Sequence, residues 1–160
     1  MNFLDWIGIT NSGHALGVGD TVPDAASRDQ NALPVRLSEF CGDGFTLVFF
    51  YPKADTPGCT AQACSLRDGF AELQDRGVRV IGVSSDNPEA QRRFAEKHRL
   101  PFTLLADEDH AVAKAFGVRL LLGMTHRQVF LIRDGRVVWR DLSASTREQA
   151  RDVLRFLEKK

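Results

Sequence analysis

The sequence predicts a single α/β domain in which a mixed β-sheet is covered by helices on both faces. Two short runs, residues 45–51 and 78–86, have the continuous apolarity of strands buried on both faces of a parallel sheet. The segments that follow such runs change to the three- and four-residue spacing of helices. Near the C-terminus, Asp134 and Gly135 separate two apolar runs and predict a tight hairpin.

Length and charge limit what the domain can be. The 160 residues are enough for one self-sufficient hydrophobic core. The 21 basic residues cancel the 21 acidic ones, so we expect no nucleic-acid partner and no acidic membrane surface. No membrane span is expected, because no apolar run is long enough. No secretion signal is expected, because the N-terminus lacks a basic region and Asp5 interrupts its one apolar stretch. Three cysteines are too few for a disulfide scaffold, which favours intracellular thiols and a cytoplasmic location.

The first half of the domain reads as strand, helix, strand. Residues 45–51, FTLVFFY, form an aromatic and β-branched run bounded by turn residues. From Cys59 to Asp75 the apolar positions recur at helical spacing, and Gly77 ends this helix. Residues 78–86 form the second buried strand. Residues 1–16 are interpreted as an N-terminal extension, and residues 17–160 as the domain.

The second half adds a helix, a strand, a short helix, a hairpin and a final helix. Asn87 can cap the helix in residues 86–100, with Pro88 in its first turn. Gly117 closes the short helix. The expected ranges are 102–107 for the strand, 107–117 for the short helix, 127–141 for the hairpin and 145–160 for an amphipathic helix. With right-handed crossovers, this order gives a thioredoxin-like fold with a mixed central sheet.

The stretch TPGC, from Thr56 to Cys59, places a cysteine where the first strand passes into the first helix. Unpaired N–H groups and the helix dipole stabilise an anion there, so this position favours the reactive thiolate over a buried, inert thiol. The Thr56 hydroxyl could bond the sulfur and a substrate oxygen, or only cap the turn. Pro52 could wall a site or simply end the strand.

The sequence PKADTPGC, from Pro52 to Cys59, resembles the Pro-x-x-x-Thr/Ser-x-x-Cys active-site motif of the peroxiredoxins. The wider match is similar to the bacterioferritin comigratory protein, or peroxiredoxin Q, branch. The supporting stretches are GDTVPD at residues 19–24, FAEKHRLPFTLLADEDHAVAKAFGV at 94–118 and HRQVFLIRDGRV at 126–137. The resemblance covers roughly residue 17 to the C-terminus.

The resemblance implies a role for five residues. Cys59 would be the peroxidatic cysteine, with Thr56 bonding its thiolate and the peroxide, and Pro52 shielding the sulfur from water. Arg127 matches the active-site arginine, whose charge favours the thiolate and polarises the O–O bond. Without the resemblance, Arg127 would read as a solvated strand-end residue. Cys64 matches the resolving cysteine of those relatives that carry both cysteines on one helix, whereas Cys41 has no counterpart.

The implied activity is that of a thioredoxin-dependent peroxidase acting on hydrogen peroxide and organic hydroperoxides, without a cofactor or metal. Cys59 is oxidised to a sulfenic acid, Cys64 closes a disulfide, and thioredoxin or a similar dithiol reduces it. We expect a monomer, with a dimer as the alternative. The stretch at residues 117–127, GVRLLLGMTHR, is shorter and more apolar than the loop of many relatives. That departure leaves the preferred peroxide open, and the leucines could instead form a self-association patch.

Two other readings compete with the peroxidase. A thioredoxin-like disulfide oxidoreductase would need a second cysteine three residues after Cys59, where this chain has Gln62. It would also need a proline before the strand that faces the thiols, a region occupied here by residues 124–127, MTHR. A zinc site could combine both cysteines with a histidine, but the spacing is wrong for a closed site. The peroxidase is therefore the preferred interpretation.

Overall fold

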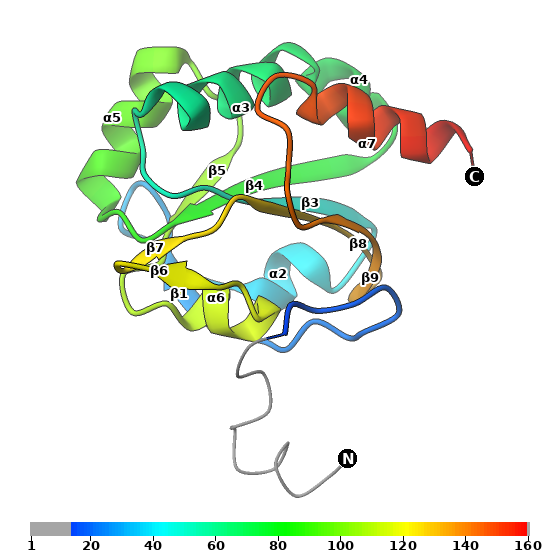
Figure 1. The fold of residues 1–160 in the computed structure, drawn as a ribbon, viewed down its shortest axis with the longest axis horizontal. Coiled ribbons are helices and arrows are strands. Elements are labelled where there is room, and N and C mark those ends of the chain that lie inside the picture. Colours follow the sequence, from blue (N-terminus) through cyan, green and yellow to red (C-terminus); the bar gives the residue numbers. More distant parts are fainter. Residues whose placement is uncertain (1–13, 160) are drawn as a thin grey trace, which may run out of the picture.

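The computed structural model describes residues 14–159 as a three-layer α/β domain (Figure 1). Its central sheet has the strand order β5-β4-β3-β8-β9. The strands β3, β4 and β5 are parallel, β8 pairs antiparallel with β3, and β9 pairs antiparallel with β8, so the sheet is mixed. These strands are β3 (Phe45–Phe50), β4 (Val78–Ser84), β5 (Thr103–Ala106), β8 (Gln128–Arg133) and β9 (Arg136–Asp141). The predicted fold class is therefore confirmed.

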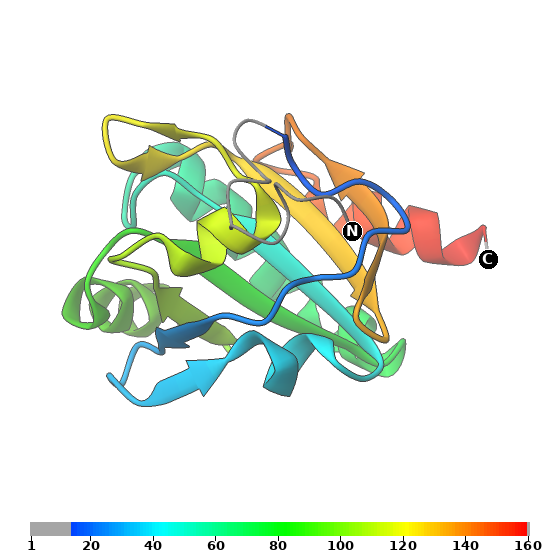
Figure 2. The same ribbon diagram turned by 90° about the horizontal axis from the view of Figure 1, so that it is seen from below.

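Helices cover both faces of the sheet. The upper layer in Figure 1 contains α3 (Pro57–Asp68), α4 (Phe70–Asp75), α5 (Pro88–His98) and α7 (Gln149–Glu158). Figure 2, seen from below, shows the opposite layer, with α2 (Leu37–Cys41), α6 (Ala111–Phe116) and the small sheet of β1 (Ala26–Arg28) and β2 (Pro34–Arg36). A second small hairpin, β6 (Leu120–Leu121) and β7 (Met124–Thr125), projects beside β8.

Strand β3 lies between two hydrophobic cores. Leu47 and Phe49, with the following Tyr51, face the core beneath α3, α5 and α7, whereas Val48 and Phe50 face the core above α2 and α6. All five side chains have no exposed surface. Because complete burial of one large apolar side chain contributes about 1.5–3 kcal/mol, β3 is a rigid base for whatever its C-terminal end carries.

Several predicted helix and turn features are confirmed. The Asn87 side chain accepts the Ala90 N–H at 2.9 Å, with Pro88 in the first turn of α5. Asp134 and Gly135 have φ of 50° and 83°, the positive values that a type I′ hairpin turn needs.

Other expectations need correction. The single helix expected from Cys59 to Asp75 is two helices, α3 and α4, because Gly69 departs from helical geometry with φ −93° and ψ 5°. A side chain at Gly69 would lie 2.5 Å from the Cβ of Ala150, so glycine lets the helix pair approach α7 closely. The last helix begins at Gln149, four residues after the predicted start. Helix α2 and the strands β1, β2, β6 and β7 were not predicted, since each is very short.

The predicted extension lies mostly outside the described residues, which begin at His14. Leu16 is buried, and its N–H donates to the carbonyl of Phe116 at 2.9 Å. Among residues 14–159, no helix is long and apolar enough to cross a membrane. In the same part of the chain, no cluster of three or more His, Cys, Asp or Glu side chains could hold a metal ion.

Candidate active site

The loop between β3 and α3 is fixed to the neighbouring helix α5. Asp55 adopts a left-handed conformation, with φ of 63°, and its carboxylate lies 3.0 Å from Lys97 Nζ and 3.2 Å from His98 Nε2. The hydrogen bond from Lys97, followed by that from His98, lowers the pKa of Asp55. An acid with a lowered pKa keeps its partners at neutral pH and loses them only in strong acid. These contacts therefore join the loop to α5 at neutral pH.

A buried chain of hydrogen bonds supports the same loop from below. The N–H of Ala54 donates to the Asp86 carboxylate at 2.8 Å, which also accepts the Ser84 hydroxyl at 2.6 Å. Gln91 donates to the Ser84 oxygen at 2.9 Å and accepts the hydroxyl of Tyr51. Burial raises the pKa of Tyr51, so its hydroxyl stays protonated and remains a donor. This chain joins β3, β4 and α5 to the loop.

Helix α3 begins immediately after this loop. Thr56 is its N-cap, Pro57 occupies the first helical position, and Cys59 lies in the first turn with 1% of its surface exposed. The first N–H groups of a helix have no helical acceptor and carry its positive dipole end. Cys59 therefore lies at the start of the helix, as the sequence predicts, and its side chain is buried.

Arg127 completes the site from the start of β8, the strand that pairs with β3. It directly precedes β8, and its Nη2 lies 3.4 Å from the sulfur of Cys59. Its Nη1 donates to Oε1 of Gln62 at 2.7 Å. A side chain at Gly58 would come within 3.0 Å of Nη2, so glycine gives the guanidinium room to reach the sulfur. The guanidinium therefore places a positive charge beside the sulfur of Cys59.

Thr56 makes a different hydrogen bond from the one expected. Its hydroxyl donates to the backbone carbonyl of Lys53 at 2.8 Å. A hydroxyl has one hydrogen to give, so it does not donate to the sulfur in this arrangement. Its oxygen can still accept a hydrogen bond from a bound hydroperoxide. Pro52 lies two residues after the end of β3 and is half-buried, a position compatible with shielding the site.

Cys64 lies in the third turn of the same helix and is half-buried. Helix α3 is continuous between the two cysteines, and both are free thiols. In a regular helix, Cα atoms five residues apart are separated by roughly 8–9 Å. A disulfide needs about 4.4–6.8 Å. The two sulfurs can therefore meet only after the intervening backbone unwinds.

Cys41 is separated from the site by the sheet. It ends α2 in the opposite core, with 2% of its surface exposed, and burial raises its pKa to about 12. A thiol with this pKa is protonated at neutral pH and does not act as a nucleophile. We expect Cys41→Ala to keep peroxide turnover within about twofold of the unchanged protein. Parallel steady-state assays check this, and a loss of turnover comparable to that of Cys59→Ala would contradict it.

Sequence reasoning did not assign Gly58, Gln62 or Gln149 to the site. Gln62 lies one turn after Cys59, among the buried positions Ala63 and Leu66, and has no exposed surface. A glutamine at a core position of an amphipathic helix was the available signal, since buried amides need partners. Gln149 could not be found in this way, because its contact with Gln62 joins residues 87 positions apart.

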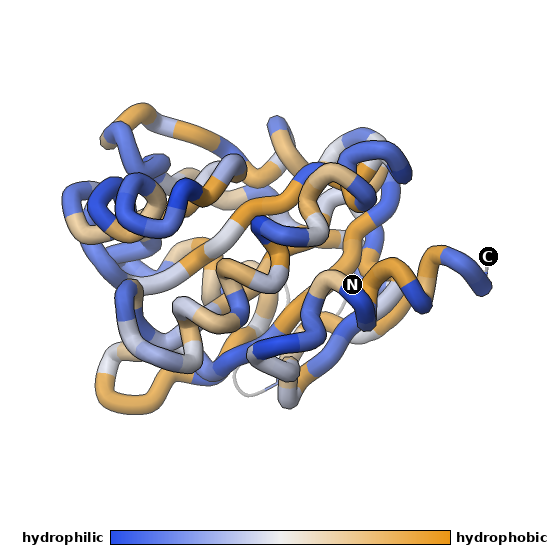
Figure 3. Tube along the Cα trace, turned by 90° about the horizontal axis from the view of Figure 1, so that it is seen from above, coloured by the Kyte–Doolittle hydropathy of each residue, from blue (hydrophilic) through white to orange (hydrophobic). Residues whose placement is uncertain are grey.

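The hairpin of β6 and β7 stands at the rim near Arg127. Leu120, Leu121 and Leu122 are 40%, 62% and 89% exposed, and the hydropathy trace of Figure 3 shows the hairpin as an apolar projection. Thr125 anchors its base, donating from its hydroxyl to the carbonyl of Tyr51 at 2.8 Å. The predicted apolar loop is therefore present, and it is attached to the strand that leads to the site.

Comparisons with known proteins agree with this geometry. A model of the AhpC/TSA family matches residues 18–140. Peroxiredoxin Bcp of Escherichia coli K12 is 50% identical over 130 residues, covering 76% of this chain and 83% of that protein. Peroxidoxin BcpB from Mycobacterium tuberculosis superposes with a TM-score of 0.83 at 39% identity, over 90% of this chain and 97% of that one. Xanthomonas campestris bacterioferritin comigratory protein, studied for alkyl peroxide reduction activity, gives 0.78 at 26% identity, over 91% and 98%.

Proposed function

Because the chain belongs to the AhpC/TSA family, as a peroxiredoxin of the Bcp and peroxiredoxin Q group, we propose that its peroxidase reaction runs through Cys59. Peroxiredoxins are thiol-dependent peroxidases, and this chain is one of them. The single observation that supports the assignment of Cys59 is its sulfur at the start of α3, 3.4 Å from Arg127.

The first step is the attack of the Cys59 thiolate on one oxygen of a hydroperoxide. The S–O bond forms as the O–O bond breaks, and the other oxygen takes up a proton and leaves as water or an alcohol. Charge builds up on the separating oxygens, where N–H groups at the start of α3 and the guanidinium of Arg127 stabilise it. Thr56 accepts a hydrogen bond from the peroxide, and Pro52 keeps water from the sulfur. Cys59 is left as a sulfenic acid.

Cys64 then resolves this intermediate. Its thiol condenses with the sulfenic acid of Cys59, which forms the disulfide and releases one water. A thiol reductant returns both cysteines to the reduced state by exchange. Thioredoxin is the proposed donor, because its dithiol can open the intramolecular bridge through a mixed disulfide.

The disulfide step predicts a local opening of α3. The buried residues of α3 are Cys59, Gln62, Ala63 and Leu66, and Leu66 is the one large apolar side chain among them, so limited apolar surface opposes unwinding of the first turns. Amides of residues 60–66 are expected to lose hydrogen-exchange protection on oxidation, whereas β3, buried in both cores, keeps it. Exchange on reduced and oxidised protein, read by mass spectrometry, checks this. Equal protection of residues 60–66 in both states, with the disulfide confirmed, would contradict the mechanism.

The function is tested by peroxide-dependent NADPH oxidation with thioredoxin and thioredoxin reductase. We expect turnover with hydrogen peroxide, and no turnover when Cys64→Ser replaces the resolving thiol. That variant should instead accumulate a sulfenic acid that dimedone traps, and it should over-oxidise readily. If an equally abundant disulfide between Cys59 and Cys41 is trapped, the assignment of Cys64 as the resolving cysteine is wrong. Insulin reduction measures the alternative oxidoreductase activity, which is disfavoured because the fully buried Gln62 occupies the second-cysteine position.

The cellular location, the oligomeric state and the preferred peroxide are also proposals. A cytoplasmic location suits three free thiols, since a reducing compartment keeps them reduced. A monomer is the proposed oligomeric state, with a dimer as the alternative. The exposed leucines of the β6–β7 hairpin stand where an alkyl group could lie, and relative rates with hydrogen peroxide and cumene hydroperoxide measure that preference.

A further inference from the structure

Gln62 and Gln149 form a buried pair of amides behind Arg127. Nε2 of Gln62 donates to Oε1 of Gln149 at 2.8 Å, and Oε1 of Gln62 accepts from Arg127 at 2.7 Å. Neither glutamine has any exposed surface. The contacts thus run from the sulfur of Cys59 through Arg127 and Gln62 to the first residue of α7. We refer to Arg127, Gln62 and Gln149 as the amide relay.

The direction of every hydrogen bond in the amide relay follows from the guanidinium. Arginine can only donate, so Gln62 must turn its oxygen toward Arg127 and its NH₂ group toward Gln149. Gln149 must then present its oxygen, and its own Nε2 is buried without a partner among the described residues. Rotating the Gln149 amide would set two NH₂ groups against each other. A buried donor is thus left unpaired to keep Gln62 oriented toward Arg127.

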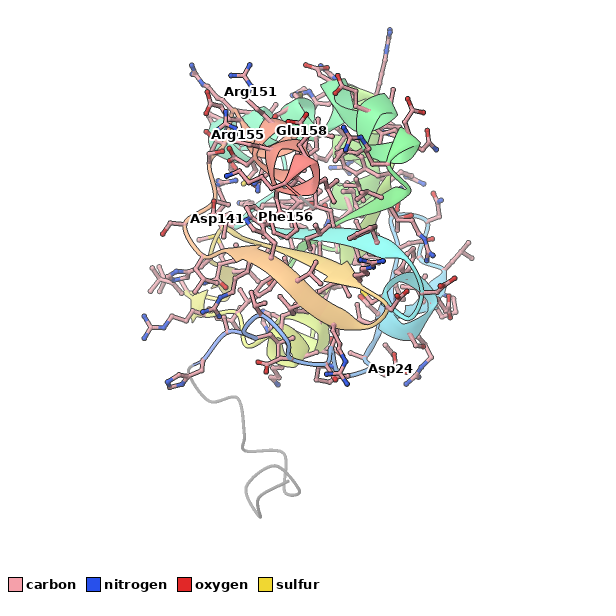
Figure 4. All side chains as sticks on the ribbon, turned by 90° about the vertical axis from the view of Figure 1, so that its right-hand side faces the viewer. Asp24, Asp141, Arg151, Arg155, Phe156 and Glu158 are labelled. Carbon is pink, nitrogen blue, oxygen red and sulfur yellow. The ribbon has the colours of Figure 1, made fainter. Side chains whose placement is uncertain are left out.

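The outer end of the amide relay is fixed by the packing of α7. Val153 and Leu157 of this helix belong to the core above the sheet, and Ala150 lies against Gly69 between α3 and α4. Figure 4 looks along α7, with Arg151 and Arg155 on its outer side and Phe156 toward the strands. Phe156 lies 6.1 Å from the ring of Trp139 on β9. Gln149 therefore presents its oxygen from a helix that the core holds in place.

We propose that Gln149 is a positioning residue for the peroxide step and acts through Gln62 on Arg127. The proposal rests on the function proposed above for Cys59 and Arg127. It has a second consequence, because Gln62 lies between Cys59 and Cys64. When α3 unwinds to form the disulfide, Gln62 leaves both partners. The amide relay therefore also stabilises the helical form of α3 that reacts with peroxide.

The test substitutes Gln149→Met, which keeps the length of the side chain and removes the acceptor. Single-turnover oxidation of Cys59 by hydrogen peroxide is expected to slow about tenfold, because a displaced guanidinium loses its transition-state contact. Amides of residues 60–66 in the reduced protein should exchange faster. Gln149→Glu keeps an acceptor oxygen toward Gln62 and should restore most of the rate.

Two comparisons separate positioning from a general structural role. In an Arg127→Ala background, Gln149→Met should have almost no further effect on oxidation, since its route to the sulfur is gone. Val112→Ala removes core packing on the opposite face of the sheet, outside the amide relay and away from α7. It should lower the melting temperature and leave the oxidation rate within about twofold of the unchanged protein.

Specific outcomes would overturn the proposal. If the unchanged protein is active and Cys59 of the Gln149→Met variant is oxidised at the same rate, the proposed peroxidase function is retained and the positioning role is rejected. The same conclusion follows if the tenfold loss persists in the Arg127→Ala background. If Gln149→Met does not fold, Gln149→Asn, whose amide is too short to reach Gln62, must show the loss instead. An unchanged protein that consumes no peroxide would reject the proposed function itself.

Discussion

Cys59→Ser is expected to abolish peroxide turnover. A serine hydroxyl is not ionised near neutral pH, so neither the N–H groups of α3 nor Arg127 has an anion to stabilise, and the S–O bond cannot form. The replacement is nearly isosteric and lies at the start of a helix, so the fold should persist. NADPH-coupled turnover and the melting temperature, measured on the same preparation, separate the two effects.

The matched control is Cys41→Ser, which makes the same chemical change in the opposite core, away from the site. It should lose some stability and keep its activity. Full turnover by Cys59→Ser would reject the assignment of the peroxidatic cysteine. If both variants are folded and both lose activity, the loss of turnover does not report specifically on Cys59.

Arg127→Ala is expected to slow oxidation of Cys59 by roughly a hundredfold, the usual scale for removing an electrostatic transition-state contact. It also leaves Oε1 of the fully buried Gln62 without its partner, which costs about 1–3 kcal/mol of stability. Arg127→Lys keeps the positive charge, but its single ammonium group cannot contact the Cys59 sulfur and the Gln62 amide at the same time. It should therefore recover only part of the rate. Stopped-flow oxidation by hydrogen peroxide measures these rates directly.

Arg119→Ala is the control for that variant, because it removes an exposed arginine from the other side of the β6–β7 hairpin. Its oxidation rate should stay within about twofold of the unchanged protein. An unchanged single-turnover rate in Arg127→Ala would assign the guanidinium a structural role only.

The position of Cys59 could be predicted because every signal for it is local. An apolar run gives β3, Pro57 and Gly58 interrupt it, and the helical spacing begins at once. Arg127 is different, because it reaches Cys59 across 68 residues through the pairing of β3 with β8. That register sets Phe50 opposite Gln128 and so brings the preceding arginine to the end of the strand. Hydrophobic patterning does not state which strands pair, so only the family resemblance pointed to Arg127.

The Thr56 hydroxyl and the Gln149 amide show a second limit. Whether Thr56 donates to sulfur or to the Lys53 carbonyl depends on the path of the loop between β3 and α3, including Asp55 in its left-handed conformation. Gln149 was expected inside a helix, and the structure makes it the first residue of α7, turned toward Gln62. Both outcomes depend on side-chain geometry at distances of about 3 Å, which residue spacing alone does not fix.

The unbroken helix between Cys59 and Cys64 also limits the peroxide concentration at which the enzyme can keep turning over. After the first oxidation, the sulfenic acid has two fates: unwinding of α3, whose rate does not depend on substrate, and attack by a second peroxide, whose rate rises with peroxide concentration. The ratio of the two rate constants defines a crossover concentration. Below it the enzyme cycles; above it Cys59 passes to the sulfinic acid and is lost from the pool. A substitution that tightens or loosens α3 therefore moves the peroxide level at which a cell would lose this defence.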